Sequence, residues 1–150
     1  MNTSSSSNSV PSGVQGPCPN GWHVPSDAEW TILTNYVSSQ PSYHYSITAT
    51  YIAKSLASST SNWTQYSLSN KIYTVGNATY PNNATGFAAM PAGQRTTASS
   101  SVNFGNFAYF WSSTENSSNA KYREIKYTSE DVSSGNGAKK GGYSVRCLKN

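Results

Sequence analysis

The chain has 150 residues, of which 35% are apolar, 13% aromatic and only 11% charged. This length suits one domain with a single core, and no stretch is apolar and long enough to predict a membrane-spanning helix. The net charge is +4, but acidic residues are interspersed among the C-terminal Lys and Arg residues, so the dense basic patch of a nucleic-acid-binding protein is not expected.

Residues 1–16 are rich in Ser, Asn, Gly and Pro and show no hydrophobic periodicity. Such a composition predicts a flexible tail or linker outside the core, so we expect the ordered domain to span residues 17–150. The segment has neither a basic n-region nor an apolar h-region, and the sequence therefore predicts no signal peptide within this chain. A piece of a longer secreted protein and a cytosolic or phage-borne protein both stay open at this point.

The predicted domain begins with a turn followed by a short strand. The Asn-Gly pair at residues 20–21 marks the turn, and Trp22 and Val24 then alternate at period two, which predicts that both face inward. His23 lies between them, and we interpret it as a structural or surface residue rather than a catalytic one.

A helix is predicted over residues 27–38. Ser26 and Glu29 have the spacing of a capping box, in which each side chain accepts a hydrogen bond from the backbone amide of the other residue. The residues at helical spacing that we expect to face the core are Trp30, Leu33 and Val37.

The middle of the chain has little periodicity. Residues 39–48 read as a Tyr-rich loop, and the apolar spacing over residues 49–56 predicts a second short helix. Residues 57–85 are rich in Ser, Asn and Thr, which predicts long loops with a short strand near residues 71–75. Residues 86–95 are expected to form a strand that ends in a Pro/Gly turn.

The last third, residues 104–150, predicts three short strands separated by polar loops, and we expect the rest of the chain to pack around them. An aromatic strand at residues 109–111 is expected to stop at the turn-forming residues 112–113. Long polar and apolar side chains alternate over residues 121–127, and residues 143–147 place their apolar side chains on one face of a final strand.

Two cysteines, Cys18 and Cys147, bracket this predicted domain. They form no CxxC or Cys/His spacing, so no metal site and no cofactor is expected. In an oxidising compartment a disulfide between them would contribute roughly 4–5 kcal/mol by loop-closure entropy. Two unpaired buried thiols are the alternative.

Four motifs in this order, CPNGWHVPSDAEW, GFAAMPAGQR, FWSSTE and GYSVRCLKN, closely resemble the Fibrobacter succinogenes major paralogous domain over about residues 17–150. That family is widespread in surface and secreted proteins of Bacteroidetes and Fibrobacteres. The resemblance implies an α+β, C-type-lectin-like fold, with two helices flanking a twisted antiparallel sheet, and extracellular placement, often on lipoproteins. It implies no established activity. The calcium-site motifs of sugar-binding C-type lectins are absent, so calcium-dependent sugar binding is not implied.

Catalytic patterns are weak. The histidines are His23 and His44, and neither has the neighbours that a nucleophilic triad would need. Glu115 and Glu124 form the best pair of carboxylates for acid–base chemistry, but Glu115 reads more naturally as a turn residue. We therefore predict that the chain is not an enzyme.

Loops rich in Tyr, Ser, Asn and Gly have the composition of a binding surface, because they combine rigid aromatic area with adaptable hydrogen bonding. We expect an extracellular, non-catalytic ligand-binding or adhesion module that recognises a glycan or a surface protein, with no direct membrane insertion. The candidate ligand-binding residues are Tyr45, Tyr66, Asn106, Asn116, Asn119, Tyr122, Arg123, Tyr127 and Lys139. The aromatic residues expected in the core instead are Tyr109, Trp111 and Tyr143.

Two other functions fit the same residues. Residues 103–136 are rich in Asn, Ser, Thr and Tyr, as expected for a hypervariable display protein of a diversity-generating retroelement. A structural module of a cell-envelope assembly is the third hypothesis. The sequence does not assign the ligand or the oligomeric state.

Overall fold

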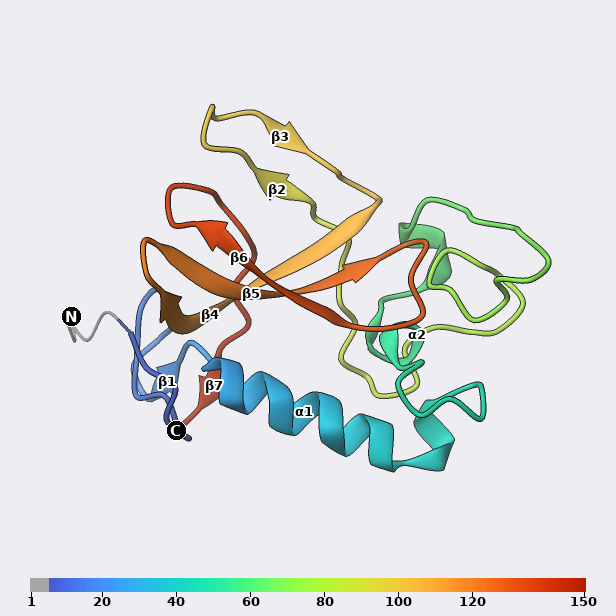
Figure 1. Cartoon of the computed structure of the whole chain (residues 1–150), viewed down its shortest axis with the longest axis horizontal. Coiled ribbons are helices and arrows are strands. Elements are labelled where there is room, and N and C mark those ends of the chain that lie inside the picture. Colours follow the sequence, from blue (N-terminus) through green and yellow to red (C-terminus); the bar gives the residue numbers. More distant parts are fainter. Residues whose placement is uncertain (1–5) are drawn as a thin grey trace.

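The computed structural model describes residues 6–150 and has an α+β architecture (Figure 1). Its helical segments are α1 (Asp27–Ser39), the 3-10 turn η1 (Pro41–Tyr43), α2 (Ala53–Leu56) and the 3-10 turn η2 (Thr60–Asn62). Its strands are β1 (Trp22–His23), β2 (Gln94–Arg95), β3 (Ser101–Val102), β4 (Phe107–Asn116), β5 (Asn119–Lys126), β6 (Ser133–Ala138) and β7 (Leu148–Lys149). The main sheet has the order β4-β5-β6, while β1 pairs with β7 and β2 with β3, all antiparallel.

Helix α1 confirms the predicted helix and its capping box. The Glu29 N–H donates to the Ser26 hydroxyl at 3.1 Å, and the Ser26 N–H donates to the Glu29 carboxylate at 2.9 Å. Trp30 and Val37 are buried, and α1 packs against β4 and β5. Figure 1 shows α1 lying along one side of the main sheet.

The core lies between α1, α2 and the face of the main sheet that carries Ala108, Phe110 and Ile125. Its buried members are Trp30, Val37, Ile52, Ala53, Leu56, Ala57, Trp63, Val75, Ala89, Ala108, Phe110 and Ile125. The ring centroids of Trp30 and Phe110 are 5.6 Å apart. Large rings therefore supply much of the buried area in a chain that has few aliphatic residues.

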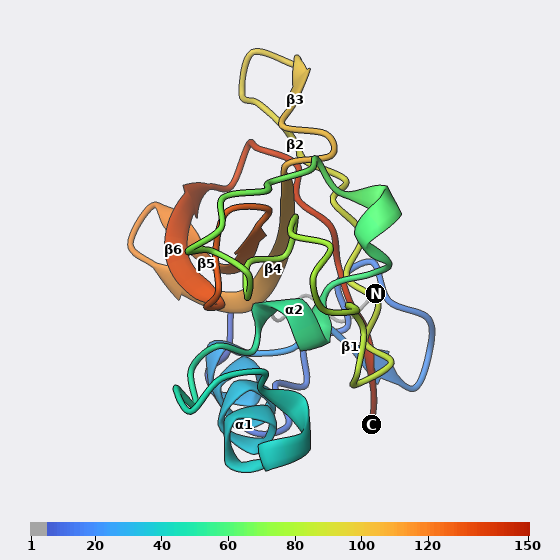
Figure 2. The same ribbon diagram turned by 90° about the vertical axis from the view of Figure 1, so that its right-hand side faces the viewer.

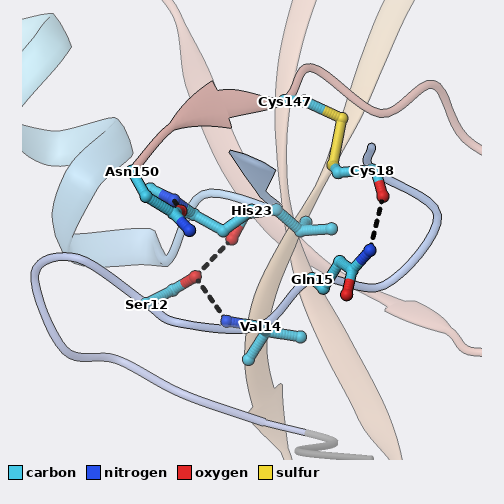
Figure 3. Close-up of a disulfide and its surroundings, with 8 residues drawn as sticks. Ser12, Val14, Gln15, Cys18, His23, Cys147 and Asn150 are labelled. Carbon is cyan, nitrogen blue, oxygen red and sulfur yellow. Dashed lines mark hydrogen bonds between the residues drawn. A yellow bond between two sulfur atoms is a disulfide. The ribbon is translucent and has the colours of Figure 1, made fainter. Parts of the chain in front are cut away.

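The N-terminal segment differs from the predicted flexible tail. Val14 is buried, and its carbonyl accepts the Val24 N–H at 2.8 Å. The Ser12 hydroxyl donates to the Val24 carbonyl at 2.6 Å and accepts the Val14 N–H at 3.2 Å (Figure 3). The Ser7 N–H donates to the Ser113 carbonyl at 3.0 Å. These contacts dock part of the Ser-rich segment on the domain, while the first five residues of the predicted tail lie outside the described residues.

The predicted disulfide is confirmed, because Cys18 and Cys147 are bridged (Figure 3). It joins the segment before β1 to the segment before β7, and those two strands also pair with each other. The expectation that Trp22 faces inward is wrong, because its residue surface is 39% exposed. His23 is the buried residue of β1, as its structural interpretation required.

The ring nitrogens of His23 lie 2.6 Å from Asn150 Oδ1 and 2.9 Å from Glu29 Oε1. Burial lowers the pKa of His23, but the hydrogen bonds to Asn150 and Glu29 and the charge of Glu29 outweigh burial and raise the pKa above its ordinary value. His23 thus connects β1, the C-terminal residue and the start of α1.

Strand β4 does not stop at residues 112–113 as predicted. Residues 112–114 have no partner in β5, where the register of the ladder shifts, and earlier parts of the chain bond them instead. The Ser113 N–H donates to the Pro25 carbonyl at 2.8 Å, and the Thr114 hydroxyl donates to the Ser7 carbonyl at 2.8 Å. Strand β5 confirms the strand predicted at residues 121–127.

Other predicted elements are shorter than expected or absent. The helix predicted over residues 49–56 is reduced to α2, and residues 71–75 form turns instead of a strand. Only β2 is a strand within residues 86–95, and only β7 lies near the predicted final strand at residues 143–147. Strand β6 was not predicted.

Candidate ligand-binding face of the main sheet

The face of the main sheet that points away from α1 carries a layer of aromatic rings, which we call the aromatic face. Side chains alternate across a strand, so β4 sends Ala108 and Phe110 to the core and its odd-numbered rings to the other side. The five rings of the aromatic face are Phe107, Tyr109, Trp111, Tyr122 and Tyr143. Figure 2 shows that the three strands behind them are strongly curled.

Tyr143 joins this layer from a segment that runs beside β4. Backbone hydrogen bonds hold that segment: the Ser144 N–H donates to the Tyr109 carbonyl at 3.1 Å, and the Trp111 N–H donates to the Ser144 carbonyl at 3.0 Å. The Tyr143 ring centroid is 4.2 Å from Trp111, 4.8 Å from Tyr109 and 5.0 Å from Tyr122. Tyr109 is buried among them, while the other four rings are only half-buried.

Two glycines of β6 make room for the rings. A Cβ on Gly135 would lie 2.6 Å from the ring of Tyr122, which is opposite it in the sheet. A Cβ on Gly137 would lie 2.9 Å from the rings of both Trp111 and Tyr143. The glycine-rich sequence of β6 is therefore required by the aromatic face that packs on it.

Two charged side chains lie in the same layer. Glu124 is opposite Tyr109 in the sheet, and Lys126 is opposite Phe107, with its Nζ 5.5 Å from the ring centroid. Burial raises the pKa of Glu124, although Lys126 and the hydrogen bond with Tyr109 lower it. Burial and the Glu124 charge also raise the pKa of the Tyr109 and Tyr122 hydroxyls. These hydroxyls are therefore hydrogen-bond donors at neutral pH, beside a carboxylate that accepts.

The structure does not bring the predicted binding residues together at one site. Tyr122 is the member on the aromatic face. Tyr66 and Tyr127 contact each other edge-to-face at 5.8 Å, and the Tyr127 N–H donates to the Asn106 carbonyl at 2.9 Å, near the start of β4. Tyr45 lies elsewhere, stacked in the loop region on another tyrosine.

The remaining candidates lie at the tip of the β4–β5 hairpin or face α1. Asn116 and Asn119 pair across the hairpin, and Lys139 contacts Glu115 at 2.6 Å. Arg123 points to α1 and pairs with Asp27 at 2.8 Å, on the opposite face of the sheet from Tyr122. These residues could not all contact one small ligand.

Sequence reasoning missed most of the aromatic face. Trp111 and Tyr143 were expected in the core, but they pack on the sheet face opposite the core and are only half-buried. The period-two rings at Phe107, Tyr109 and Trp111 were the signal that could have revealed this face, together with Glu124 on the alternating strand that follows.

The described residues offer little for metal or paired-carboxylate chemistry. Within residues 6–150, no group of three or more His, Cys, Asp or Glu side chains could hold a metal ion. Glu115 is opposite Ala120 in the sheet, whereas Glu124 is four positions further along β5. Four strand positions correspond to about 13 Å, more than the roughly 5–10 Å of a glycosidase carboxylate pair. Stacking area and hydrogen bonds are what the aromatic face can offer a ligand.

Within residues 6–150 there is no helix with the length and apolar character that crossing a membrane requires.

Comparisons with known proteins place the chain in a family. No curated protein and no solved structure matches the chain significantly. The family described as the Fibrobacter succinogenes major domain matches residues 4–149. The chain therefore belongs to the Fibrobacter succinogenes major domain family.

Proposed function

We propose that this domain is a non-catalytic carbohydrate-binding module and that the aromatic face is its binding surface. The observation that carries the proposal is the layer of half-buried rings with hydroxyl donors and the Glu124 carboxylate among them. The C–H faces of sugar rings pack on aromatic side chains, and sugar hydroxyls need nearby donors and acceptors.

The rings pack closely against one another in the absence of a ligand, and we infer that they are ordered before binding. Tyr143 contacts three other rings, and the β6 glycines fit closely beneath them. A surface that is already ordered loses little conformational entropy on binding, so its contacts contribute more fully to affinity. This rigidity supports the aromatic face over the scattered loop residues as the primary binding surface.

We place the domain outside the cell, on a surface or in a secreted protein. The disulfide supports this location, because disulfides persist mainly in oxidising compartments. The C-type-lectin-like fold is also part of the proposal. The pairing of β1 with β7, which brings the two ends of the domain together around long loops, supports it.

Binding to a broad glycan array, with and without EDTA, tests the function. We expect specific signal that survives EDTA and is lost in Tyr122→Ala and reduced in Glu124→Gln. The matched control is Tyr36→Ala, which removes a tyrosine of α1 that is 57% exposed and should leave the signal unchanged. Signal that is lost in EDTA would contradict metal-free binding, and a silent array would favour protein partners or a structural role.

A further inference from the structure

A second surface, on the other side of the main sheet, is apolar and hollowed. Three adjoining hollows with volumes of ≈ 280, 220 and 380 Å³ lie beside α1, and Leu33 lines all three. Phe87 lines two of them, Tyr36 two and Leu148 two. We call this continuous surface the α1 groove.

Several large apolar side chains along the α1 groove are exposed to solvent and do not contribute to the core. Ile32 and Tyr36 are 55% and 57% exposed, although they lie on the same helix as the buried Trp30 and Val37. Val10 is 56% exposed at the edge of the same groove. Contiguous exposed apolar surface of this kind marks interaction sites in soluble proteins.

The groove also carries one available positive charge. The Arg146 guanidinium lies 4.5 Å from the Phe87 ring centroid and donates to the Phe87 carbonyl at 2.8 Å. Within the described part of the chain, no carboxylate pairs with it. Glu29 lines the same hollow, but its oxygens already accept from the Ser26 N–H at 2.9 Å and lie 2.9 Å from His23. The Glu29 side chain keeps its charge but is only 8% exposed, so the exposed Arg146 guanidinium is the charged group of the groove that a partner can reach.

The hollow beside Arg146 is lined by Trp30, whose ring nitrogen is a buried donor. This Nε1–H has no acceptor among residues 6–150. Buried polar groups without a partner are rare in folded proteins, because leaving a buried donor unsatisfied costs free energy. The Nε1 atom is itself closed off from solvent, so a ligand in this hollow would contact the Trp30 ring, while its carboxylate would accept from Arg146.

We propose that the α1 groove binds a short apolar peptide segment that carries a carboxylate. The carboxylate lies against Arg146, and apolar side chains of the peptide fill the hollows along Leu33 and Tyr36. Residues 29 to 36 of α1 span about 10 Å at 1.5 Å per residue, which matches a segment of about three extended residues. This site is independent of the aromatic face and serves a protein partner.

Titration of the whole ¹⁵N-labelled chain with N-acetyl-Leu-Phe-Leu, which ends in a free carboxylate, tests the proposal by NMR. The indole N–H signal of Trp30, assigned with Trp30→Phe, should shift saturably. The same peptide ending in an amide should bind about tenfold more weakly, because a charge-assisted hydrogen bond is lost.

Two variants with matched controls locate the site. Arg146→Gln should weaken binding of the acid about tenfold, whereas Arg95→Gln, at another exposed arginine, should not. Ile32→Ser should also weaken binding, whereas Ile47→Ser, at a residue that is 102% exposed outside the groove, should not.

Several outcomes would overturn the proposal. One is equal affinity for the acid and the amide, and another is an equal effect of Arg146→Gln and Arg95→Gln. Absence of any Trp30 shift at millimolar peptide would reject the site. Saturable binding of laurate without binding of the peptide would replace the peptide with a lipid, and concentration-dependent self-association that Ile32→Ser abolishes would replace it with a second copy of the chain.

Discussion

The main sheet and the loop region of residues 57–85 are held together by different interactions. The sheet has two antiparallel ladders, of which the β4–β5 ladder shifts register between Trp111 and Glu115, and ring layers on both faces. The loop region depends on polar side chains that reach its backbone: the buried Lys54 ammonium donates to the carbonyls of Thr74 at 3.1 Å and Asn77 at 2.5 Å, and the Asn82 amide donates to the Ser58 carbonyl at 2.9 Å. The loop region also adds Trp63 and Val75 to the core, so the comparison teaches that buried donors can supplement apolar packing where a segment has no regular backbone ladder.

Removal of a core ring should damage the sheet most. Phe110→Ala leaves a cavity where Phe110 meets Trp30, and we expect the free energy of unfolding to fall by about 3 to 5 kcal/mol. Urea unfolding followed by tryptophan fluorescence measures this. Phe104→Ala is the control, because Phe104 is 83% exposed and its loss should cost less than about 0.5 kcal/mol. Equal costs for the two variants would show that the ring layer does not support the sheet.

The contribution of the loop region to stability should depend on pH, because Lys54 is buried against it. Burial lowers the pKa of Lys54 from 10.5 to about 8, so between these values the unfolded chain binds more protons than the folded chain. The free energy of unfolding should therefore rise with pH between 7.5 and 9.5, by roughly 2 kcal/mol. Urea unfolding over this range measures the rise, below the pH at which tyrosines with raised pKa values, such as Tyr109 and Tyr122, begin to oppose it.

Lys54→Met should abolish this rise, whereas Lys71→Met, at a lysine whose side chain is 43% exposed, should retain it. A wild-type slope that persists in Lys54→Met would mean that other groups, and not this buried ammonium, titrate in that window.

The aromatic face should be sensitive to a single methyl group. Gly137→Ala places a Cβ 2.9 Å from the Trp111 and Tyr143 rings, so we expect a loss of between about 1 and 3 kcal/mol from overpacking. The near-ultraviolet circular dichroism of the rings should change as well. Ser134→Ala, on an exposed position of the same strand, should alter neither quantity. An unchanged spectrum in Gly137→Ala would show that the rings are not fixed over β6.

The two halves also differ in what the sequence could predict. Helix α1 was predictable because the cap and the apolar spacing lie within one local segment, and β5 because its side chains alternate. Strand β6 was not predictable from its own residues, since its glycines are explained by rings that lie outside the strand, on β4, on β5 and at Tyr143. Lys54 likewise lies in an apolar helix pattern, and its burial depends on carbonyls that belong to the loop.

The candidate site shows the same limit. The tyrosine-rich composition indicated a binding surface, but composition does not show which side of a strand each side chain faces. The predicted residues lie at several separate places. The pairing of β4 with β5 decides that Tyr122 joins Trp111 on one face while Arg123 turns to α1 on the other. Only the period of two in each strand contained that information.

The smallest expected effect concerns His23, at the junction of β1, β7 and α1. Because the folded-state pKa is raised, the stabilisation from His23 is fully present below pH 6.5 and is lost as pH rises through the folded-state pKa. Urea unfolding between pH 5.5 and 8 should show a fall in wild type that is weaker in His23→Gln, which cannot titrate. The rise at alkaline pH that Lys54 causes should stay intact in His23→Gln, since the two side chains share no hydrogen-bond partner. Loss of both slopes in His23→Gln would mean that the titrations of His23 and Lys54 are coupled.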